Sequence, residues 1–396
     1  MNYRRFGRTN LQMPVFSCGG MRFQQSWKDE DANRITPENQ ANLEACVQRA
    51  LELGIHHIET ARGYGTSEFQ LGRILPFLPR EKILVQTKVC PTADPKEFLD
   101  AFRLSLSNLR LDYVDLFAIH GINNDEHLNF TLRKGGCLDV ARQLQRDGRC
   151  RFIGFSTHGT ERIISAAVRT GEFDYVNLHW YFVNPLNWPS IEAAARLDMG
   201  VFIISPNDKG GMLQNRPARM TALCAPLTPM QFNDLYCLAR PQVHTLSCGV
   251  ARPSDFDEHI AALAYYERAA EVVAPIEARL RAEMQRVLGA DWCAHWSDGL
   301  GEYHQMPHQV NVVEILRLWT FAKSLGLDEW ARMRYNLLSG GASHWFPGEK
   351  ADRMKDERAL RAACAKNPFA DRIPAILRQA HALYDGAPLK RLSQSD

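Results

Sequence analysis

From residue 1 to about residue 270, short runs of apolar and β-branched residues alternate with longer amphipathic segments. This alternation is typical of α/β proteins, in which right-handed crossovers connect the strands of a parallel sheet. Eight runs within roughly 250 residues match the closed (β/α)8 TIM barrel in number and size. An open, doubly wound sheet is the alternative, but FSCGGMRF after the first run lacks the glycine fingerprint of that fold. The eight runs are PVFSCGG, IHHIET, KILVQTKV, YVDLFAIH, CRFIGFS, YVNLHWYF, GVFIISP and VHTLSCG.

Segments between these runs have the periodicity of helices. In PENQANLEACVQRALELG, apolar residues recur at every third or fourth position, with Pro37 near the start and Gly54 just beyond the end. DPKEFLDAFRLSLSNLRL and LDVARQLQRDG repeat the pattern, and the second ends at Gly148. We therefore predict helices on the outside of the barrel at these places.

From about residue 271 the strand pattern stops and helical segments predominate. These segments are PIEARLRAEMQRVLG, VNVVEILRLWTFAKSLG, DERALRAACAKN and IPAILRQAHALY. We expect a barrel in residues 1–270, an appended C-terminal α-helical domain in residues 271–390 and a flexible tail in residues 391–396.

Polar side chains follow several predicted strands, where a (β/α)8 barrel carries its functional groups. Tyr64 lies five residues after Glu59 in ETARGYG, and Lys88 and His120 end the third and fourth strands. A free phenol titrates near pH 10, so it is a weak acid at neutral pH. A neighbouring ammonium lowers the pKa of a phenol, a carboxylate keeps that ammonium charged, and a neutral histidine polarises a carbonyl. The four side chains together predict proton transfer to or from an oxygen.

The same residues carry a resemblance to a known family. GIHHIETARGYGTSEFQLG resembles the G-I-x-x-x-D-T-A-x-x-Y-G-x-S-E-x-x-L-G signature of the aldo-keto reductases, and ILVQTK, DYVDLFAIHG and CRFIGFSTHG resemble later blocks in the same order. The resemblance, which covers residues 1 to about 270, implies NADPH-dependent reduction of an aldehyde or ketone to an alcohol. It implies that Tyr64 is the general acid, that Lys88 tunes it and that His120 orients the carbonyl. Glu59 occupies the position of the family's aspartate, and its extra methylene moves the carboxylate by about 1.5 Å, so we expect slower or retuned chemistry.

The resemblance also implies a cofactor site. SCGVARPSDFDEH is similar to the G-x-x-(K/R)-P-x-x-x-x-E-N block of the family, with Arg252 at the position that contacts the 2′-phosphate, which favours NADPH over NADH. SPNDKGG resembles the loop over the pyrophosphate, whereas Ile204 stands where many relatives stack a tyrosine on the nicotinamide. The residues implied for the cofactor are Ser156, Thr157, Asn177, Ser205, Lys209, Gly249, Arg252, Glu258 and His259.

Three further residues are candidates for the substrate pocket. His158 and Trp180 are predicted to line it, and Arg62 either pairs with Glu68 or meets an acidic substrate. Loops 22–36, 121–137 and 212–230 are expected to supply the remaining walls.

The helical segments resemble the C-terminal ferredoxin-like domain of some bacterial aldo-keto reductases, which carries C-x-x-C-x-x-C-x-x-x-C-P runs. CAHWSDGLGEYHQMPHQVNV retains Cys293, and CAKNPFADRIPAIL has Cys364 but Asn367 where the cysteine before Pro368 would stand. Because a cubane cluster needs four thiolates, we expect no iron–sulfur cluster. The spacing of these cysteines and the nearby histidines fits no zinc pattern, so we predict no metal.

Composition narrows the function classes further. The net charge of +2 gives no strong field for nucleic acid or anionic lipid, and the ten cysteines are scattered singly. The N-terminus has no apolar segment of signal-peptide length, and we expect a cytoplasmic enzyme with a small carbonyl substrate and no membrane partner. An NADPH-binding regulatory or sensor protein with little turnover is the alternative, and an electron-transfer module is a second one. Oligomeric state stays open.

Overall fold

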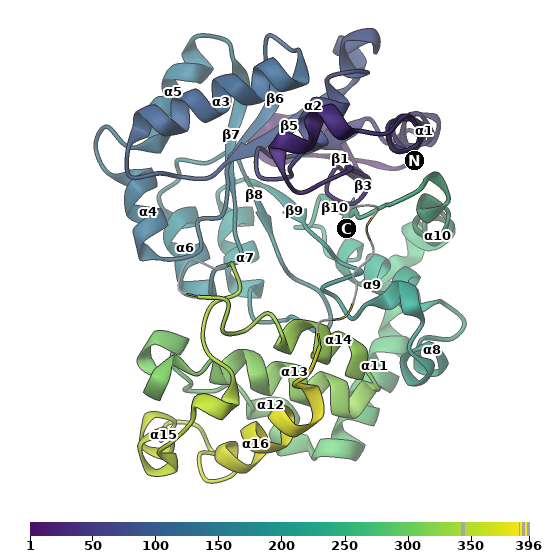
Figure 1. Ribbon diagram of the computed structural model, residues 1–396. Coiled ribbons are helices and arrows are strands. Elements are labelled where there is room, and N and C mark those ends of the chain that lie inside the picture. Colours follow the sequence, from purple (N-terminus) through teal and green to yellow (C-terminus); the bar gives the residue numbers. More distant parts are fainter. Residues whose placement is uncertain (342–344, 388, 390–392, 394–396) are drawn as a thin grey trace.

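The eight predicted strands form one closed barrel in a computed structural model, which describes residues 1–341, 345–387, 389 and 393 (Figure 1). All strands of the barrel are parallel, and their order is β10–β3–β4–β5–β6–β7–β8–β9. The predicted (β/α)8 fold is therefore confirmed. The strands are β3 (Phe16–Gly19), β4 (His57–Glu59), β5 (Leu84–Val89), β6 (Val114–Ile119), β7 (Cys150–Ser156), β8 (Tyr175–Leu178), β9 (Gly200–Ile203) and β10 (Thr245–Cys248).

Helices cover the outside of this barrel, and the local sequence explains where they begin. The α1 helix starts at Pro37, where the Thr36 hydroxyl accepts a hydrogen bond from the Asn39 amide, and Gly54 follows its end with φ +79°. Asp94 caps the next predicted helix in the same way. The helices are α1 (Pro37–Glu52), α2 (Ser67–Leu71), α3 (Pro95–Leu109), α4 (Asp125–Leu132), α5 (Cys137–Arg146), α6 (Glu161–Arg169), α7 (Trp188–Arg196), α8 (Ala218–Cys224), α9 (Pro229–Leu238) and α10 (Asp257–Ala262).

An N-terminal hairpin, β1 (Tyr3–Arg5) and β2 (Gln12–Pro14), closes the amino end of the barrel. The Phe6 ring packs 5.7 Å from that of Tyr175 inside the barrel. Gly200 leaves room for this plug, since a Cβ atom there would lie 2.6 Å from the Phe6 ring. The hairpin closes the amino end of the barrel. Side chains at the carboxyl ends of the strands lie at the opposite, open end.

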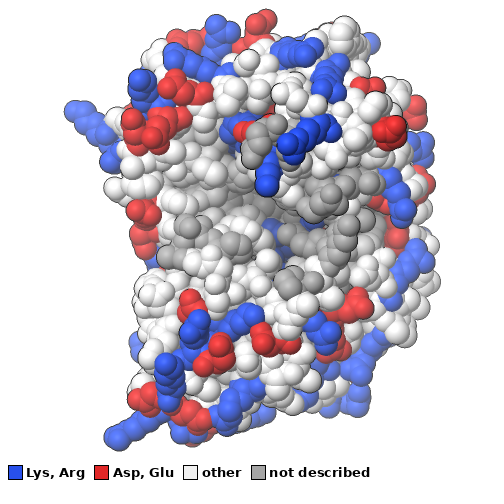
Figure 2. Space-filling view, viewed as in Figure 1, with Lys and Arg blue, Asp and Glu red and all other residues white. Residues whose placement is uncertain are grey.

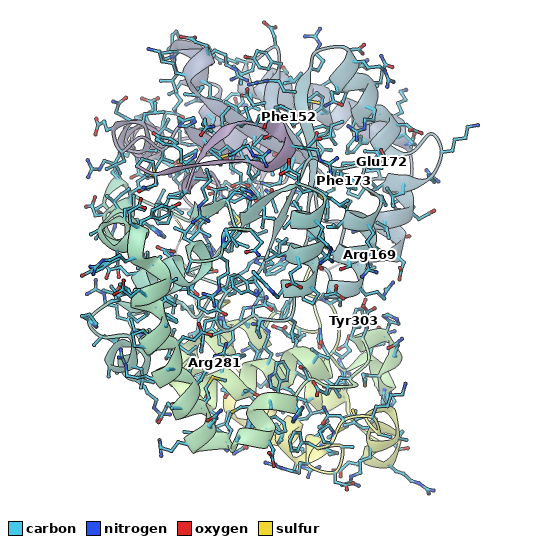
Figure 3. The ribbon with its side chains drawn as sticks, turned by 180° about the vertical axis from the view of Figure 1, so that it is seen from behind. Phe152, Arg169, Glu172, Phe173, Arg281 and Tyr303 are labelled. Atoms are coloured by element: carbon cyan, nitrogen blue, oxygen red, sulfur yellow. The ribbon has the colours of Figure 1, made fainter. Side chains whose placement is uncertain are left out.

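The C-terminal helices pack together on one side of the barrel (Figure 1). Seen from behind, Arg281 marks α11 in the lower half of the molecule, and its guanidinium lies 5.5 Å from the ring of Phe182 (Figure 3). Buried side chains of both parts form one continuous hydrophobic cluster. The first of these helices begins at Ala269, two residues before the expected boundary, and the tail 391–396 lies outside the described residues except for residue 393. The helices are α11 (Ala269–Leu288), α12 (Ala290–His295), α13 (Val312–Leu325), α14 (Asp328–Tyr335), α15 (Glu357–Ala363) and α16 (Ile373–Tyr384).

Asn367 organises a turn at the position where the cluster motif would place a cysteine. Its buried side-chain amide donates to the carbonyl oxygens of His295, Trp296 and Asp298 at 3.4, 3.1 and 2.8 Å. Its Oδ1 atom accepts from the Phe369 amide at 2.8 Å. The amide thus ties together segments that are far apart in the sequence. Among the described residues, no three His, Cys, Asp or Glu side chains are grouped as metal ligands.

The distribution of charged side chains on the surface and the hydropathy of the helices can be compared with the sequence. Positive and negative side chains are interspersed on the face shown in Figure 2, whose central part is hollowed. No helix in the described part of the chain has both the length and the hydropathy needed to cross a bilayer.

Candidate active site

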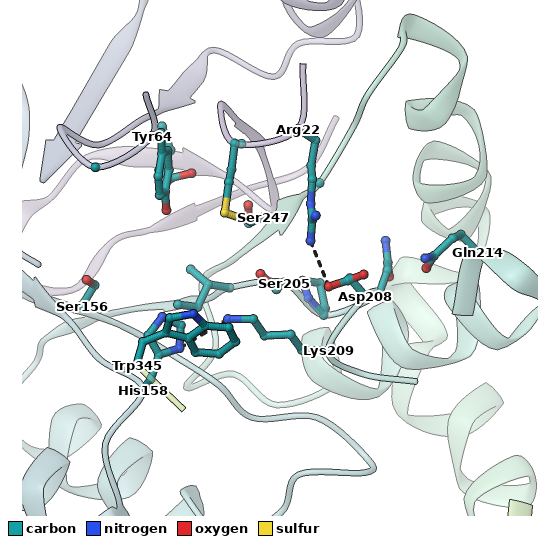
Figure 4. A pocket seen from close by; sticks show the side chains of 18 of the residues that line it. Arg22, Tyr64, Ser156, His158, Ser205, Asp208, Lys209, Gln214, Ser247 and Trp345 are labelled. Atoms are coloured by element: carbon teal, nitrogen blue, oxygen red, sulfur yellow. Dashed lines mark hydrogen bonds and ion pairs between the residues drawn. The ribbon is translucent and has the colours of Figure 1, made fainter. Parts of the chain in front are cut away.

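A cavity of about 920 Å³ opens at the carboxyl ends of the strands (Figure 4). Loops after most of the barrel strands contribute to its wall, as barrel topology predicts. Twelve of the residues singled out from the sequence line it: Glu59, Tyr64, Lys88, His120, Ser156, His158, Ser205, Lys209, Gly249, Arg252, Glu258 and His259.

Tyr64, Lys88 and Glu59 form a hydrogen-bonded group at the floor of the cavity. Lys88 Nζ donates to the Glu59 carboxylate, to the Thr60 carbonyl at 2.8 Å and to Tyr64 Oη at 3.1 Å. The Tyr64 hydroxyl lies 3.3 Å from Glu59 Oε1. The His120 ring stands nearly perpendicular to the Tyr64 ring, with centroids 5.8 Å apart. The longer glutamate side chain therefore reaches both the ammonium and the phenol.

Burial controls the protonation of this group. It raises the pKa of the Tyr64 phenol above its ordinary value, although Arg22 acts in the opposite direction. It also lowers the pKa of Lys88 well below the usual value for an ammonium. For His120, burial and then the charges of Lys88 and Lys209 lower the pKa to about 3, so this imidazole is neutral. Desolvation is thus the largest effect on the Tyr64 phenol, and the lowering of its pKa by the Lys88 ammonium stays a prediction.

Ser156 and Asn177 lie side by side on the adjacent strands β7 and β8. Ser156 lines the cavity, whereas Asn177 is fully buried and is not among the lining residues. Neither side-chain atom Nδ2 nor Oδ1 of Asn177 has a hydrogen-bond partner among the described residues. Thr157 also lies behind the wall, where its hydroxyl donates to the Ile122 carbonyl at 2.7 Å. The amide of Asn177, without a hydrogen-bond partner among the described residues, therefore lies next to Ser156.

The rim beyond β10 carries the predicted basic residue. Arg252 is exposed, and its Nε donates to Asp255 at 3.0 Å. Glu258 lies 3.2 Å from Arg216. His259 is buried below the rim and pairs with Asp234 of α9 at 2.7 Å, a contact that no local sequence pattern indicates.

Two loops meet across the cavity. Arg22, after β3, and Asp208, after β9, form a buried ion pair of 2.9 Å, which Figure 4 shows as a dashed line. Ser205 to Lys209 turn sharply, and Ser205 has φ +52°. The sequence places both loops at the open end but contains no signal for this pairing across 186 positions.

The C-terminal helical part also reaches the cavity. Trp345 lines it, with its ring 4.7 Å from that of His158 and 4.1 Å from Lys209 Nζ (Figure 4). His158 in turn lies 2.6 Å from His179 through their ring nitrogens. Trp330 of α14 donates to the Lys209 carbonyl at 2.9 Å, which fixes this side of the cavity. Trp345 and His179 are absent from the sequence-based predictions, because Trp345 lies far from the barrel strands in the sequence and His179, although it directly follows β8, belongs to no recognised motif.

Two predicted pocket residues do not line the cavity. Arg62 forms ion pairs with the buried Glu68 and with Asp29, which corresponds to the first of its two expected roles. Trp180 is buried in the core, where its ring stacks on Tyr236 at 5.0 Å and also contacts Trp188. The prediction that Trp180 lines the pocket is therefore wrong in this structure, because its side chain turns toward α7 and α9 instead of the open end.

Comparisons with known proteins give the same assignment for the barrel. The sequence profile of the Aldo/keto reductase family matches residues 16–290. An aldo-keto reductase of Mycolicibacterium smegmatis is 34% identical over 145 residues, which are 35% of this chain and 49% of that protein. One of Mycobacterium sp. (strain MCS) is 36% identical over 148 residues, 36% of this chain and 50% of that protein. The chain thus spans about half the length of these curated relatives.

Solved structures support the fold. An aldo-keto reductase from Bacillus halodurans has a TM-score of 0.57 at 17% identity and covers 70% of this chain and 96% of its own. The thermostable aldo-keto reductase Tm1743 has a TM-score of 0.56 at 20% identity and covers 70% of this chain and 100% of its own. The profile match extends over more than half of the chain, from the first barrel strand to the start of α12. The chain belongs to the aldo/keto reductase family.

Proposed function

We propose that this protein is an NADPH-dependent reductase that converts an aldehyde or ketone to an alcohol. The observation that supports this most directly is the hydrogen-bonded group of Tyr64, Lys88 and Glu59 beside the neutral His120 at the floor of a large cavity. It provides a proton donor, a nearby charge pair and a hydrogen-bonding imidazole at one place.

Each side chain has a separate role in the proposal. When bound, the reduced nicotinamide supplies a hydride to the carbonyl carbon. Tyr64 donates its hydroxyl proton to the carbonyl oxygen, and its raised pKa keeps the phenol protonated until that step. His120 hydrogen-bonds the same oxygen and orients it, and Lys88, held by Glu59, stabilises the phenolate that remains on Tyr64. A proton from solvent then restores the phenol.

Several features of the cavity fit a nicotinamide dinucleotide. Ser156 at the cavity wall would hydrogen-bond the carboxamide, and the buried Asn177 amide beside it on β8 would support this end of the site. The loop from Ser205 to Lys209 would lie over the pyrophosphate, closed by Arg22 and Asp208. Arg252 at the rim would bind a 2′-phosphate through its Nη atoms, which favours NADPH. Gly249, Glu258 and His259 line the same end.

Tyr64→Phe tests the proposal. With NADPH and a panel of aromatic, aliphatic and carboxylated aldehydes, wild type should turn over and Tyr64→Phe should lose about 10³-fold in kcat, while its Kd for NADPH stays unchanged. Tyr113→Phe is the matched control, because Tyr113 packs against Arg80 outside the cavity and should leave kcat unaffected.

An NADPH sensor with little turnover is the second candidate, favoured by Glu59 in the position of the family's aspartate. Tight NADPH binding with no turnover of any aldehyde in wild type would support the sensor and contradict the reductase.

A further inference from the structure

The guanidinium of Arg62 bridges two carboxylates from different parts of the barrel. Its Nη1 atom donates to Glu68 of α2, which is fully buried, and its Nη2 atom donates to Asp29 in the loop after β3. Glu68 in turn accepts a hydrogen bond of 2.5 Å from the Thr87 hydroxyl on β5. The loop after β3 is therefore linked through Arg62 to the strand that carries Lys88.

The same loop places an indole at the cavity wall beside Tyr64. Trp27 lines the cavity, and its ring stands nearly perpendicular to the Tyr64 ring, with centroids 6.5 Å apart. Trp27 is 44% exposed, so a ligand in the cavity can contact its ring. It therefore offers a large apolar surface to a substrate whose carbonyl oxygen lies at the Tyr64 hydroxyl.

Trp27 is held from both sides along the chain. On its amino-terminal side, the Ser26 amide donates to the Thr66 hydroxyl at 3.1 Å, and the Thr66 amide donates to the Ser26 carbonyl at 3.0 Å. Gly65, with φ +52°, permits this close approach, since a Cβ atom there would lie 2.6 Å from Cα of Trp27. On its carboxyl-terminal side, the ion pair with Arg62 holds the loop two residues beyond the indole.

We infer that Asp29 and Arg62 are positioning residues for the substrate: their ion pair holds Trp27 at the cavity wall, where its indole packs against the apolar part of a bulky aldehyde. This inference rests on the proposed function, since it assumes that the cavity binds a carbonyl substrate. Arg62 is not among the residues that line the cavity, so it acts on the substrate only through the loop. An arginine suits this role, because its fork binds two carboxylates at once, whereas a lysine has a single ammonium.

Steady-state kinetics with Asp29→Asn test the inference. The KM for 2-naphthaldehyde should rise about threefold, the usual effect of losing one partly exposed ion pair. The KM for propanal, the kcat with both aldehydes and the Kd for NADPH should stay unchanged, because the catalytic group is intact. Asp198→Asn is the matched control and should change none of these values. The Asp198 side chain is 52% exposed, against 53% for Asp29, and it pairs with Arg5 at the closed end of the barrel.

Two further variants connect the effect with the indole. Trp27→Ala should raise the KM for 2-naphthaldehyde about tenfold, because the substrate loses its apolar contact. In that background Asp29→Asn should cause no further increase. Arg62→Lys keeps a positive charge beside the buried Glu68, so it protects the fold, but its ammonium does not span both carboxylates. It should raise the KM as much as Asp29→Asn does.

The position of the indole can be measured without cofactor or substrate. The full chain has eight tryptophans, so labelling with 5-fluorotryptophan gives eight ¹⁹F NMR signals, and Trp27→Phe assigns the one of Trp27. In Asp29→Asn this signal should move toward the shift of a free indole in water, and the other signals should not move. Asp198→Asn should leave the Trp27 signal in place. A Trp27 signal that is the same in wild type and Asp29→Asn would overturn the inference.

The outcomes separate the two proposals. If wild type reduces no aldehyde, the proposed function and this inference are both wrong. If wild type reduces aldehydes but Asp29→Asn leaves the KM for 2-naphthaldehyde unchanged, or raises it equally with and without Trp27, only the inference is wrong. An equal rise for propanal, or a higher Kd for NADPH, would also overturn the inference alone, because the ion pair would then act on the site as a whole.

Discussion

The Nζ atom of Lys88 lies 3.1 Å from the hydroxyl oxygen of Tyr64, and burial moves the pKa values of these two groups in opposite directions. The phenol becomes a weaker acid, and the ammonium becomes a stronger one. The phenol therefore stays protonated, and Lys88, hydrogen-bonded to both Glu59 and Tyr64, stands where its ammonium can stabilise the phenolate as soon as it arises.

The two directions of the reaction should differ in their dependence on pH. Reduction uses the protonated phenol, and because the pKa of Tyr64 is raised, kcat for reduction should not change with the titration of Tyr64 between about pH 6 and 9. Oxidation of an alcohol needs the phenolate, so its kcat should rise about tenfold per pH unit over that range. Steady-state rates with NADPH plus aldehyde and NADP plus alcohol measure both. A reduction rate that falls tenfold per pH unit in this range would contradict the prediction that a buried phenol with a raised pKa donates the proton.

Glutamate at position 59 should support faster catalysis than aspartate would. Its carboxylate contacts both Lys88 and Tyr64, and aspartate would withdraw it by about 1.5 Å. Glu59→Asp should therefore lower kcat about 10²-fold, the usual effect of misplacement on that scale, with an unchanged Kd for NADPH. Glu59→Gln keeps the length of the side chain but removes its charge. Comparing it with Glu59→Asp separates the effect of the carboxylate's position from the effect of its charge. A faster Glu59→Asp enzyme would show that glutamate slows the reaction.

Trp345, from the C-terminal part of the chain, should favour aromatic substrates by offering them an apolar contact at the cavity wall. Its ring covers Lys209 and His158 at the cavity wall. Trp345→Ala should raise the KM for bulky aromatic aldehydes several-fold, because they lose an apolar contact on entry, and leave the Kd for NADPH unchanged. Propanal, too small to reach this wall, serves as the internal control. Equal changes for both aldehydes would exclude a role for Trp345 in selectivity.

Asn367 should stabilise the helical part in place of a metal cluster. Asn367→Ala removes the donor from three carbonyl oxygens and should lower the free energy of unfolding by about 2 kcal/mol. Urea denaturation measures this, with Asn129→Ala, an exposed helical asparagine, as the control expected to have little effect. Iron analysis of the purified protein tests the expectation that no cluster is present. Stoichiometric iron would contradict it and revive the electron-transfer alternative.

The eight strands and the floor of the site could be predicted from the sequence because their determinants are local. Each strand is a short apolar run, and neighbouring strands of a (β/α)8 barrel are neighbours in the chain. Glu59, Lys88 and His120 stand at the carboxyl ends of the successive strands β4, β5 and β6, and Tyr64 follows Glu59 by five residues, so their convergence follows from chain order alone. Helix ends at Pro37 and Gly54 follow from capping chemistry within a few residues.

Only the tertiary structure decided the contacts between distant segments. Arg22 meets Asp208, Asp234 meets His259, and Trp345 reaches His158, because helices and loops pack in ways that no local pattern encodes. Packing also turned Trp180 into the core and paired Arg62 with Glu68. The tertiary structure also decided the protonation of Tyr64, since desolvation depends on everything that surrounds a side chain. The sequence by itself determined which chemical groups gather at the open end of the barrel, and the packing of the whole chain determined how they are charged and which walls enclose them.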